Sequence, residues 1–286
     1  MIANARMYSV NPEVGDLWRR LLGAVIGQAG LDIQLLEHRE PAPMQELWQR
    51  HDLAAVFMCG LPYSRSTPRP LLIAAPIPSP ADFRGLPQYW SELVVRADSA
   101  FRTVSDTFGG RLALTVPDSQ SGCWAALRYF REIADRLPLY GELIAPQVTP
   151  RRALSAVIEG AADVAPIDSY AYALLQRYNS DLTSQLRSIG RTAPTPIPAL
   201  VATPPSARAA SNSDFEALRA AFREAHRMAA TAPLLADLLL ERFASPDPSS
   251  YDALRLNFEA ASQYWKQHRL AATVHPGFAA GESFAT

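Results

Sequence analysis

The sequence predicts an α/β protein made of two successive strand-and-helix units with a helical C-terminal part. Strand-like and helix-like patterns alternate over roughly the first ninety residues, the alternation starts again near residue 111, and helical periodicity dominates the last third. The 286 residues, 48% of them hydrophobic, are enough to bury the core of one large or two modest domains.

The first unit is expected to begin with a short strand and a long amphipathic helix. The strand covers Arg6–Val10, and the helix covers Glu13–Gln28, with its apolar residues spaced to share one face. The other expected elements are a strand at Asp32–Glu37, a helix at Ala42–Arg50, a buried strand at Leu53–Cys59, and strands at Arg69–Pro76 and Ser91–Arg96. Strands separated by helices predict right-handed parallel βαβ units.

The second, smaller unit is expected to repeat the alternation. A strand at Arg111–Val116 leads through a polar turn at Pro117–Gly122 into a helix at Cys123–Leu137. Further expected elements are strands at Leu143–Val148 and Asp163–Ile167 around a helix at Pro150–Glu159, a helix at Tyr170–Leu186, segments at Arg187–Arg191 and Ala199–Thr203, and helices at Ser213–Ala230, Pro233–Ala244 and Ser249–His268.

Composition argues against several classes of function. The 27 basic and 28 acidic side chains leave a net charge of -1, so no basic field exists to attract a nucleic acid. Lys266 is the only lysine and lies in a polar helical tail, so neither a pyridoxal phosphate Schiff base nor a P-loop is expected. The two cysteines and five histidines lack metal-ligand spacing. We therefore expect no metal, no cofactor and no nucleic-acid partner.

The sequence shows neither a membrane-spanning segment nor a secretion signal. It contains no uncharged apolar run of 18 residues, and the opening MIANARMYSVNP lacks an apolar stretch behind a basic start. We expect a monomer without membrane insertion. Its location is cytoplasmic as the sequence is written, and periplasmic if the chain is a trimmed mature form.

Four ordered segments share the features of one known family. Residues 89–99 (YWSELVVRADS) suit a strand that crosses between lobes, and residues 108–113 (FGGRLA) suit a glycine-led strand entering a second lobe. Residues 117–122 (PDSQSG) form a hydroxyl-rich loop, and residues 160–169 (GAADVAPIDS) suit a second crossing. Together they resemble the type II periplasmic-binding-protein fold and, within it, the phosphonate, phosphate and phosphite substrate-binding proteins of ABC transporters.

The resemblance implies two βα lobes joined by two crossing strands, with a ligand held between them by hinge closure. Lobe 1 would comprise residues 1–95 and 192–286, and lobe 2 residues 96–191. The implied function is capture of a small anionic organic ligand or oxyanion, phosphonate-like or phosphate-like, for ABC transport or sensing. An ABC transporter permease is the implied partner.

The strongest candidate ligand residues are Ser119, Gln120, Ser121 and Gly122, which follow a strand and precede a helix. A helix N-terminus carries unpaired amides and a partial positive charge, which makes it an anion site. The two serine hydroxyls add donors, and Gly122 allows close approach to the backbone. The alternative is that Ser119 or Ser121 only caps the helix.

Other candidates lie at the expected carboxyl ends of strands, where open parallel sheets bind their ligands. They are Tyr8, Ser9, Cys59, Tyr63, Asp168, Ser169 and Tyr170, together with Tyr89 beside the first crossing. Tyrosines offer an apolar wall with a polar tip. The alternatives are that Tyr63 and Tyr170 pack between the lobes, that Asp168 caps a helix and that Tyr89 belongs to the core.

Two features bear on the ligand. Family members that bind aminoalkylphosphonates use carboxylates where this chain has VTPRR (148–152) and TPIPA (195–199), so an aminophosphonate is not expected. Cys123 is expected at a helix N-terminus, which lowers the pKa of a thiol and with Cys59 would suit a soft oxyanion such as arsenite. The alternative is that both thiols are buried small hydrophobic groups.

The alternative function is a cytosolic enzyme on the same fold, similar to the menaquinone-pathway lyases or dehydratases that act on small carboxylates. Such an enzyme needs an acid or base, for which Asp118 and Asp168 are the candidates. Because no Ser-His-Asp arrangement or carboxylate cluster has catalytic spacing, a binding protein without catalytic residues is favoured.

Overall fold

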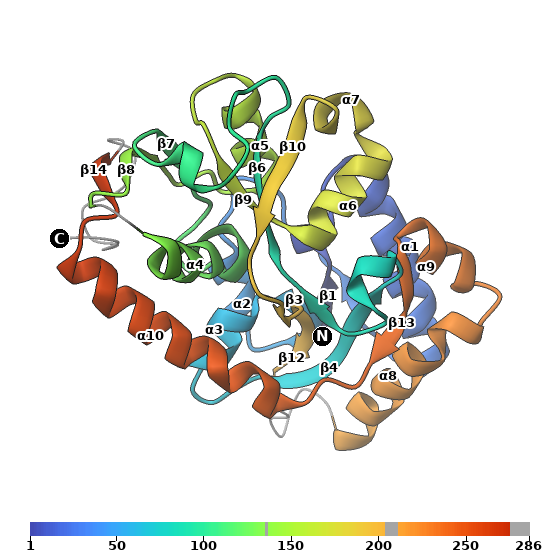
Figure 1. Cartoon of the computed structure of the whole chain (residues 1–286). Helices are drawn as coiled ribbons and strands as arrows, with labels where there is room; N and C mark the ends of the chain where they lie inside the picture. The colour runs from blue at the N-terminus through green and yellow to red at the C-terminus, as the bar shows by residue number, and fades with distance from the viewer. Residues whose placement is uncertain (135–136, 204–210, 275–286) are drawn as a thin grey trace. The chain divides into compact units, whose positions relative to one another are not determined.

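The chain folds into two compact units. The computed structural model describes residues 1–134, 137–203 and 211–274 (Figure 1). Unit 1 consists of Met1–Gln88 and Pro196–Asp252, and unit 2 consists of Tyr89–Thr195 and the chain from Ala253 on. The chain therefore passes from one unit to the other at three points.

Unit 1 is built on a six-stranded sheet in the order β13-β4-β12-β3-β1-β2. The parallel pairs are β1–β2 and β1–β3, whereas β12 runs antiparallel to both β3 and β4, and β13 runs antiparallel to β4. The strands are β1 (Ile2–Asn4), β2 (Gln34–Leu35), β3 (Leu53–Met58), β4 (Leu71–Pro78), β12 (Ala199–Ala202) and β13 (Leu240–Ala244). Every residue of β3 and β12 is buried, which explains their continuous apolar sequences.

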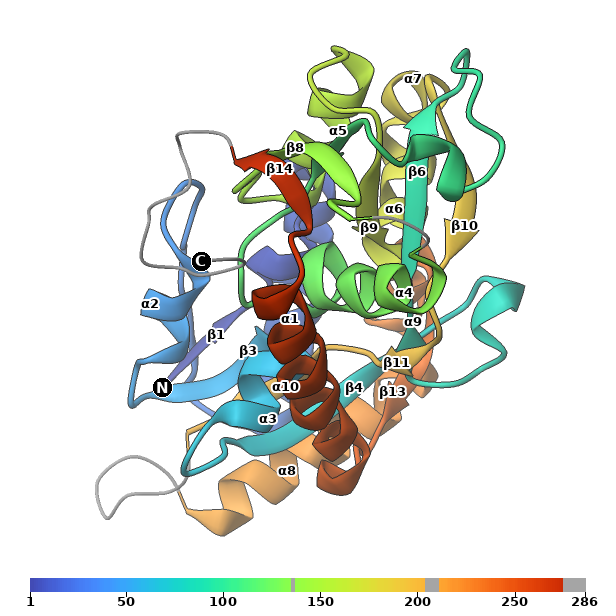
Figure 2. The ribbon, with the colours of Figure 1, turned by 60° about the vertical axis from the view of Figure 1, so that its left-hand side comes forward.

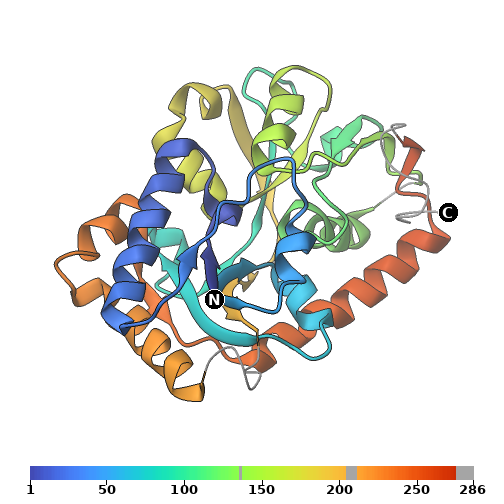
Figure 3. The ribbon, with the colours of Figure 1, turned by 180° about the vertical axis from the view of Figure 1, so that it is seen from behind.

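The longest helix of unit 1, α1 (Pro12–Ala29), has clear sequence signals at both ends. The Asn11 side chain accepts a hydrogen bond from the Val14 amide, and Gly30 adopts the left-handed conformation that ends the helix. Helix α1 packs against α8 (Figure 3). The other helices of the unit are α2 (Met44–Trp48), α3 (Gly60–Arg65), α8 (Asn212–Glu224) and α9 (Ala232–Asp237), with short η1 (Arg6–Tyr8), η2 (Ala81–Phe83), η5 (Ala225–Arg227) and η6 (Pro248–Tyr251).

Unit 2 contains two three-stranded sheets. The first, β10-β6-β9, is antiparallel, and the second, β14-β8-β7, is parallel (Figures 1 and 2). Their strands are β6 (Ser91–Arg96), β9 (Ala165–Asp168), β10 (Leu186–Arg191), β7 (Arg111–Ala113), β8 (Tyr140–Ile144) and β14 (Ala271–Val274). Where the chain passes between units, β5 (Gln88–Tyr89) pairs with β11 (Thr195–Pro196).

In unit 2, η4 (Gln120–Trp124) is one turn of π-helix that continues into α4 (Ala125–Ile133). The indole of Trp265 on α10 donates a hydrogen bond of 2.9 Å to the carbonyl of Leu127 on α4. The remaining helices are α5 (Pro150–Ile158), α6 (Ser169–Tyr178), α7 (Ser180–Thr183), α10 (Asp252–Gln267) and the short η3 (Ser105–Thr107).

Several expected elements differ from the structure. The first strand is Ile2–Asn4, and Arg6–Tyr8 is a 3-10 turn that starts where the Asn4 side chain accepts the Arg6 amide at 2.8 Å. The expected helix Pro233–Ala244 ends at Asp237, and its last residues form β13, because Leu240 to Ala244 pair with β4. The C-terminal part is therefore not wholly helical, and the large sheet is mixed rather than parallel.

The division into units differs from the expected lobes mainly at the C-terminus. The sequence placed residues 192–286 in lobe 1, whereas the chain from Ala253 on groups with unit 2. Two contacts account for this: Trp265 bonds to α4, and β14 pairs in parallel with β8. The other boundaries fall at 88/89 and 195/196, where the sequence suggested 95/96 and 191/192.

Candidate functional site

The loop before η4 places Ser119 at the helix N-cap. The Ser119 Oγ accepts a hydrogen bond of 2.9 Å from the Gly122 amide. Bonds within the helix begin later, with the Trp124 amide to the Ser119 carbonyl at 3.1 Å. A hydroxyl that accepts from an amide still has its own proton to donate. Ser119 therefore acts as the cap that the alternative interpretation required, and it also retains a donor.

Gly122 occupies a position where only glycine fits. A Cβ added there would lie 1.9 Å from the Oγ1 of Thr115 and 2.8 Å from its Cβ. The Thr115 amide also donates to the Gly122 carbonyl at 3.0 Å. The strand end and the first helical turn thus approach each other more closely than any side chain on Gly122 would allow.

The loop is free of basic residues, and it is buried at Gln120 to Gly122 and half-buried at Pro117 to Ser119. Gln120 and Ser121 are 5% and 8% exposed, and no lysine or arginine occurs between Leu114 and Leu127. The Trp124 indole donates to the Pro117 carbonyl, and its ring meets Phe258 edge-on at 4.5 Å. Any anion bound here would be held by neutral donors and by the partial charge of the helix N-terminus.

The residues after β9 form a second capped helix start. The Asp168 Oδ1 accepts the amides of Tyr170 and Ala171, both at 2.9 Å, which is the capping role considered as the alternative. The Ser169 Oγ accepts the Trp90 amide at 3.1 Å. Tyr170 is fully buried, and burial, reinforced by Asp168, raises the pKa of its phenol well above the ordinary value.

Tyr89 is also fully buried, at the point where the chain enters unit 2. Its neighbour Trp90 donates through its indole to Glu92, and the guanidinium of Arg191 lies 5.4 Å from the Trp90 ring. Ser119, Gln120, Ser121, Gly122, Asp168, Ser169, Tyr170 and Tyr89 therefore all belong to unit 2. Their contact with a ligand remains a prediction.

Tyr8 and Ser9 lie in unit 1, on the 3-10 turn after β1 rather than at the end of a strand. Tyr8 is fully buried; its ring meets Phe57 edge-on at 5.0 Å and stacks on Trp18 at 6.5 Å. The Ser9 hydroxyl donates to the Ala5 carbonyl at 3.0 Å. The structure thus places Tyr8 in an aromatic core, and its role toward a ligand remains a prediction.

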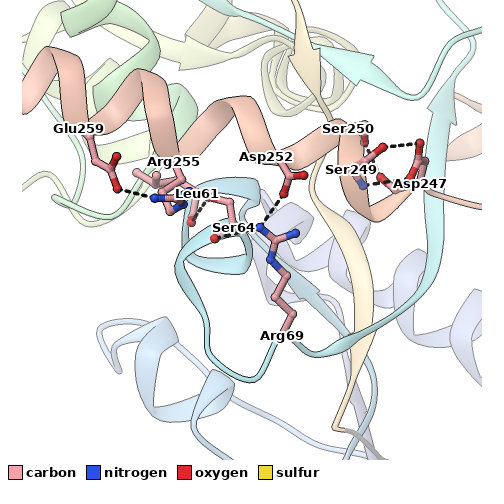
Figure 4. Close-up of polar contacts among 9 residues, drawn as sticks. All are labelled: Leu61, Ser64, Arg69, Asp247, Ser249, Ser250, Asp252, Arg255 and Glu259. Carbon is pink, nitrogen blue, oxygen red and sulfur yellow. Dashed lines mark hydrogen bonds and ion pairs between the residues drawn. The ribbon is translucent and has the colours of Figure 1, made fainter.

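Cys59 and Tyr63 follow β3 as expected. Cys59 precedes α3 and is 7% exposed, while Tyr63 is 2% exposed and meets the Tyr251 ring edge-on at 5.0 Å. The guanidinium of Arg69 lies 5.6 Å from the Tyr63 ring and forms an ion pair of 2.6 Å with Asp252 (Figure 4). Burial raises the pKa of the Tyr63 phenol, and the Arg69 charge partly opposes that rise.

Cys123 departs from the expectation of a reactive thiolate. Its side chain is fully buried, and burial, followed by the nearby Asp118 charge, raises the pKa of the thiol well above its ordinary value. Burial disfavours the charged thiolate, so the lowered pKa expected at a helix N-terminus is not found. The thiol stays protonated at neutral pH, as the alternative of a buried small group predicted.

Sequence reasoning missed three residues that hold the loop: Ser91, Thr115 and Thr192. Ser91 is fully buried and donates through its hydroxyl to the Ser121 carbonyl at 2.7 Å. The Thr192 Oγ1 accepts the Ser91 amide at 3.0 Å. The available signal was a serine at the head of the strand SELVVR, whose centre is apolar, because a hydroxyl buried there needs a partner.

Two searches of the described residues bear on other kinds of site. Among residues 1–134, 137–203 and 211–274, no group of three or more His, Cys, Asp or Glu side chains could hold a metal ion. Within the same described part of the chain, no helix combines the length and apolar character needed to cross a membrane.

Comparison with solved structures shows which fold the chain has. The chain is similar to a binding-protein component of the phosphonate ABC transporter from Pseudomonas aeruginosa, with a TM-score of 0.71 and 18% identity over 92% of this chain and 86% of that one. It is also similar to PhnD1 from Prochlorococcus marinus in complex with methylphosphonate, with a TM-score of 0.77 and 14% identity over 91% and 97% of the chains. The fold is that of the two-lobed periplasmic binding proteins, as the sequence predicted.

The sequence itself assigns the family. Residues 12–251 match the periplasmic substrate-binding proteins of phosphonate ABC transporters, and the chain belongs to this family. No curated protein sequence matched. The resemblance inferred from four short segments is thus confirmed over most of the chain, and the protein is a solute-binding protein by family.

Proposed function

We propose that the protein binds the oxyanion group of a small phosphonate or phosphate-like ligand at Ser119–Gly122, without chemical conversion, and delivers it to an ABC transporter. The observation that carries this proposal is the capped helix start itself. Hydroxyls and amides meet there in a loop that is half-buried at Ser119 and buried from Gln120 on, and residues 114 to 127 include no basic side chain. Family membership supports the same ligand class.

Neutral donors suit an oxyanion with several acceptor oxygens. Each oxygen of a phosphonate accepts more than one hydrogen bond, and a helix N-terminus with adjacent hydroxyls supplies directed donors. The single acid in the loop, Asp118, opposes additional negative charge. We therefore expect a singly charged oxyanion to bind more tightly than a doubly charged one.

Calorimetric titration and thermal unfolding with methylphosphonate, phosphate, methanesulfonate and 2-aminoethylphosphonate test the proposal. A ligand at one hundred times its Kd stabilises the folded protein by about 2.7 kcal/mol. Methylphosphonate should bind, and 2-aminoethylphosphonate should bind more weakly because residues 148–152 and 195–199 offer no carboxylate for its ammonium group. The proposal fails if none of the four anions raises the unfolding temperature.

Two further measurements separate binding from catalysis and test closure. In ³¹P NMR, methylphosphonate should remain unchanged after hours with the protein; a new phosphorus signal would instead support the enzyme alternative. Small-angle scattering should show a smaller radius of gyration with ligand, as hinge closure requires. The Ser121→Ala variant should lose affinity, whereas Ser184→Ala, at the exposed end of α7, should keep it.

A further inference from the structure

Three segments of unit 2, two of them candidate ligand segments, converge on one buried residue, Ser91. Its hydroxyl donates to the Ser121 carbonyl at 2.7 Å, and its amide donates to the Thr192 Oγ1 at 3.0 Å. In the sheet, Ser91 is the register partner of Asp168, which caps α6. Ser91 therefore links the hydroxyl-rich loop, the start of α6 and the segment at Thr192 that leads to the second passage between units, at 195/196.

The bond from Ser91 fixes a peptide plane inside the anion loop. A peptide unit is rigid, and its C=O and N–H point in opposite directions. The Ser121–Gly122 unit is held at its carbonyl by Ser91 and at its N–H by the Ser119 Oγ, at 2.7 and 2.9 Å. The next unit, Gly122–Cys123, is held at its carbonyl by the Thr115 amide at 3.0 Å.

These restraints determine where the loop donors point. Because the Ser119 Oγ accepts from the Gly122 amide, the orientation of that amide limits where the Ser119 proton can be directed. The Ser91 hydroxyl fixes this orientation through its hydrogen bond to the Ser121 carbonyl. Ser91 itself is completely shielded from solvent. It acts on a ligand only through the loop.

We propose that Ser91 is a positioning residue for the oxyanion loop, and that Thr192 fixes Ser91 in turn. The proposal rests on the proposed function of Ser119–Gly122. Thr192 is 4% exposed, its Oγ1 accepts the Ser91 amide, and its own amide donates to the Ser91 carbonyl at 3.0 Å. This series of hydrogen bonds thus connects the loop to the residues that follow the passage at 88/89 and precede the passage at 195/196.

Ser91→Ala removes the hydroxyl and leaves the buried Ser121 carbonyl without this donor. We expect the affinity for methylphosphonate to fall about tenfold or more, because the loop donors lose their fixed direction. The matched control is Thr107→Val. Thr107 is equally buried in unit 2, and its hydroxyl donates to the Val104 carbonyl at 2.6 Å, outside the loop.

Affinity is measured by calorimetry well below the unfolding temperature of every variant. There the unfolded fraction is negligible, so a general loss of stability does not change Kd. Thr107→Val should therefore lower the unfolding temperature and keep the wild-type Kd, whereas Ser91→Ala should change both. Equal Kd values for Ser91→Ala and the wild type would overturn the proposal.

A second pair of variants keeps the test available if Ser91→Ala does not fold. Thr192→Val removes the acceptor for the Ser91 amide while keeping the side-chain shape, and Thr192→Ser keeps the hydroxyl. We expect a several-fold weaker Kd for Thr192→Val and a wild-type Kd for Thr192→Ser. Loss of affinity in both variants would show that Thr192 acts through its packing and would refute the proposal that its hydroxyl fixes Ser91.

Hydrogen exchange of the ligand-free protein separates this proposal from the proposed function. Peptides covering residues 117–124 should exchange faster in Ser91→Ala than in the wild type and Thr107→Val. If the wild type binds none of the anions, the proposed function fails, while the exchange result still decides whether Ser91 orders the loop. Unchanged exchange in this segment would contradict the proposal whatever the ligand.

Discussion

The hydroxyl-rich loop of unit 2 and the aromatic cluster of unit 1, by which we mean the two ring groups around Tyr8 and Tyr63, hold their candidate side chains in different ways. In unit 2, hydrogen bonds from Ser91 and Thr115 fix the backbone around Ser121 and Gly122. In unit 1, Tyr8 and Tyr63 are held by ring contacts, with Trp18 and Phe57 around the first and Tyr251 beside the second.

This difference assigns different chemistry to the two units. Directed backbone bonds orient donors, which an oxyanion needs, whereas edge-on rings provide apolar packing with little directional control over a charge. Substitutions in the loop should therefore change ligand affinity first, and substitutions in the aromatic cluster should change stability first. The predictions below challenge this contrast, beginning with the largest expected effect.

Gly122→Ala should give the largest effect. Its new Cβ would lie 1.9 Å from the Thr115 Oγ1, so either the loop or the strand end must move. Overpacking of this kind costs about 1–3 kcal/mol of stability, and displacement of the donors should weaken methylphosphonate binding by about tenfold to one hundredfold. Calorimetric titration and thermal unfolding measure both changes.

The matched control for this substitution is Gly27→Ala on α1. A Cβ at Gly27 meets nothing within 4 Å, and the position is helical. Alanine there should stabilise the protein by about 0.5–1 kcal/mol and leave Kd unchanged. Adding Thr115→Ala to Gly122→Ala removes the Oγ1 clash and should restore part of the affinity. No restoration would mean that the clash is not the cause.

The two thiols should also differ between units. Cys123 in unit 2 is fully buried, whereas Cys59 in unit 1 is 7% exposed. In Cys59→Ser and Cys123→Ser variants, each with one remaining thiol, Cys59 should react with a maleimide at least about tenfold faster than Cys123 at pH 8, because thiolate character and access decide the rate. Equal rates would show that the loop opens readily.

The raised pKa of Cys123 also predicts an alkaline effect. In the unfolded chain a thiol ionises near its ordinary pKa of about 9.0, whereas burial keeps it protonated in the folded protein. Its contribution to stability is therefore complete below pH 9 and is lost as pH rises toward the folded pKa. Between pH 8 and 10.5, Cys123→Ala should lose less stability than the wild type.

Tyr251→Phe should reduce stability without changing affinity. The Tyr251 hydroxyl donates to the Ile197 carbonyl at 2.8 Å within unit 1, and the side chain is 2% exposed. Removing it leaves a buried carbonyl without its partner, at a cost of about 1–3 kcal/mol in the free energy of unfolding. Urea denaturation measures the cost; a changed Kd would break the proposed separation of roles.

Local sequence patterns predicted much of the framework. The strand Ser91–Arg96 and the helix after Asn11-Pro12 have the expected positions, because their apolar spacing and capping residues act locally. Pro233–Ala244 was assigned wrongly to one helix because its apolar run suits a buried strand as well as a helix. Only pairing with β4, distant in the sequence, makes the last part a strand.

The candidate loop was predictable from composition, but the contacts that hold it were not. A hydroxyl-rich stretch between a strand and a helix indicates an anion site, so Ser119–Gly122 could be selected. The bonds of Ser91 to Ser121 and to Thr192 join residues that are 30 and 101 positions apart in the sequence, respectively. The burial of Cys123 likewise arises from tertiary packing. Because of this burial, the pKa of the thiol is raised, whereas the sequence predicted that it would be lowered.

The smallest effect should come from the ion pair between Arg69 and Asp252 in unit 1 (Figure 4). The two side chains are 33% and 55% exposed, so water screens the pair and offsets most of its attraction despite the 2.6 Å separation. Asp252→Asn should lower the free energy of unfolding by less than about 1 kcal/mol, and 1 M NaCl should largely remove the difference, because the Debye length then falls to about 3 Å. Asp16→Asn, which breaks the more exposed pair with Arg19, provides the matched control and should show a still smaller change. A loss for Asp252→Asn larger than that for Tyr251→Phe would contradict this order of effects, and a loss that persists in high salt would mean that packing or hydrogen bonding at Asp252, rather than its charge, accounts for it.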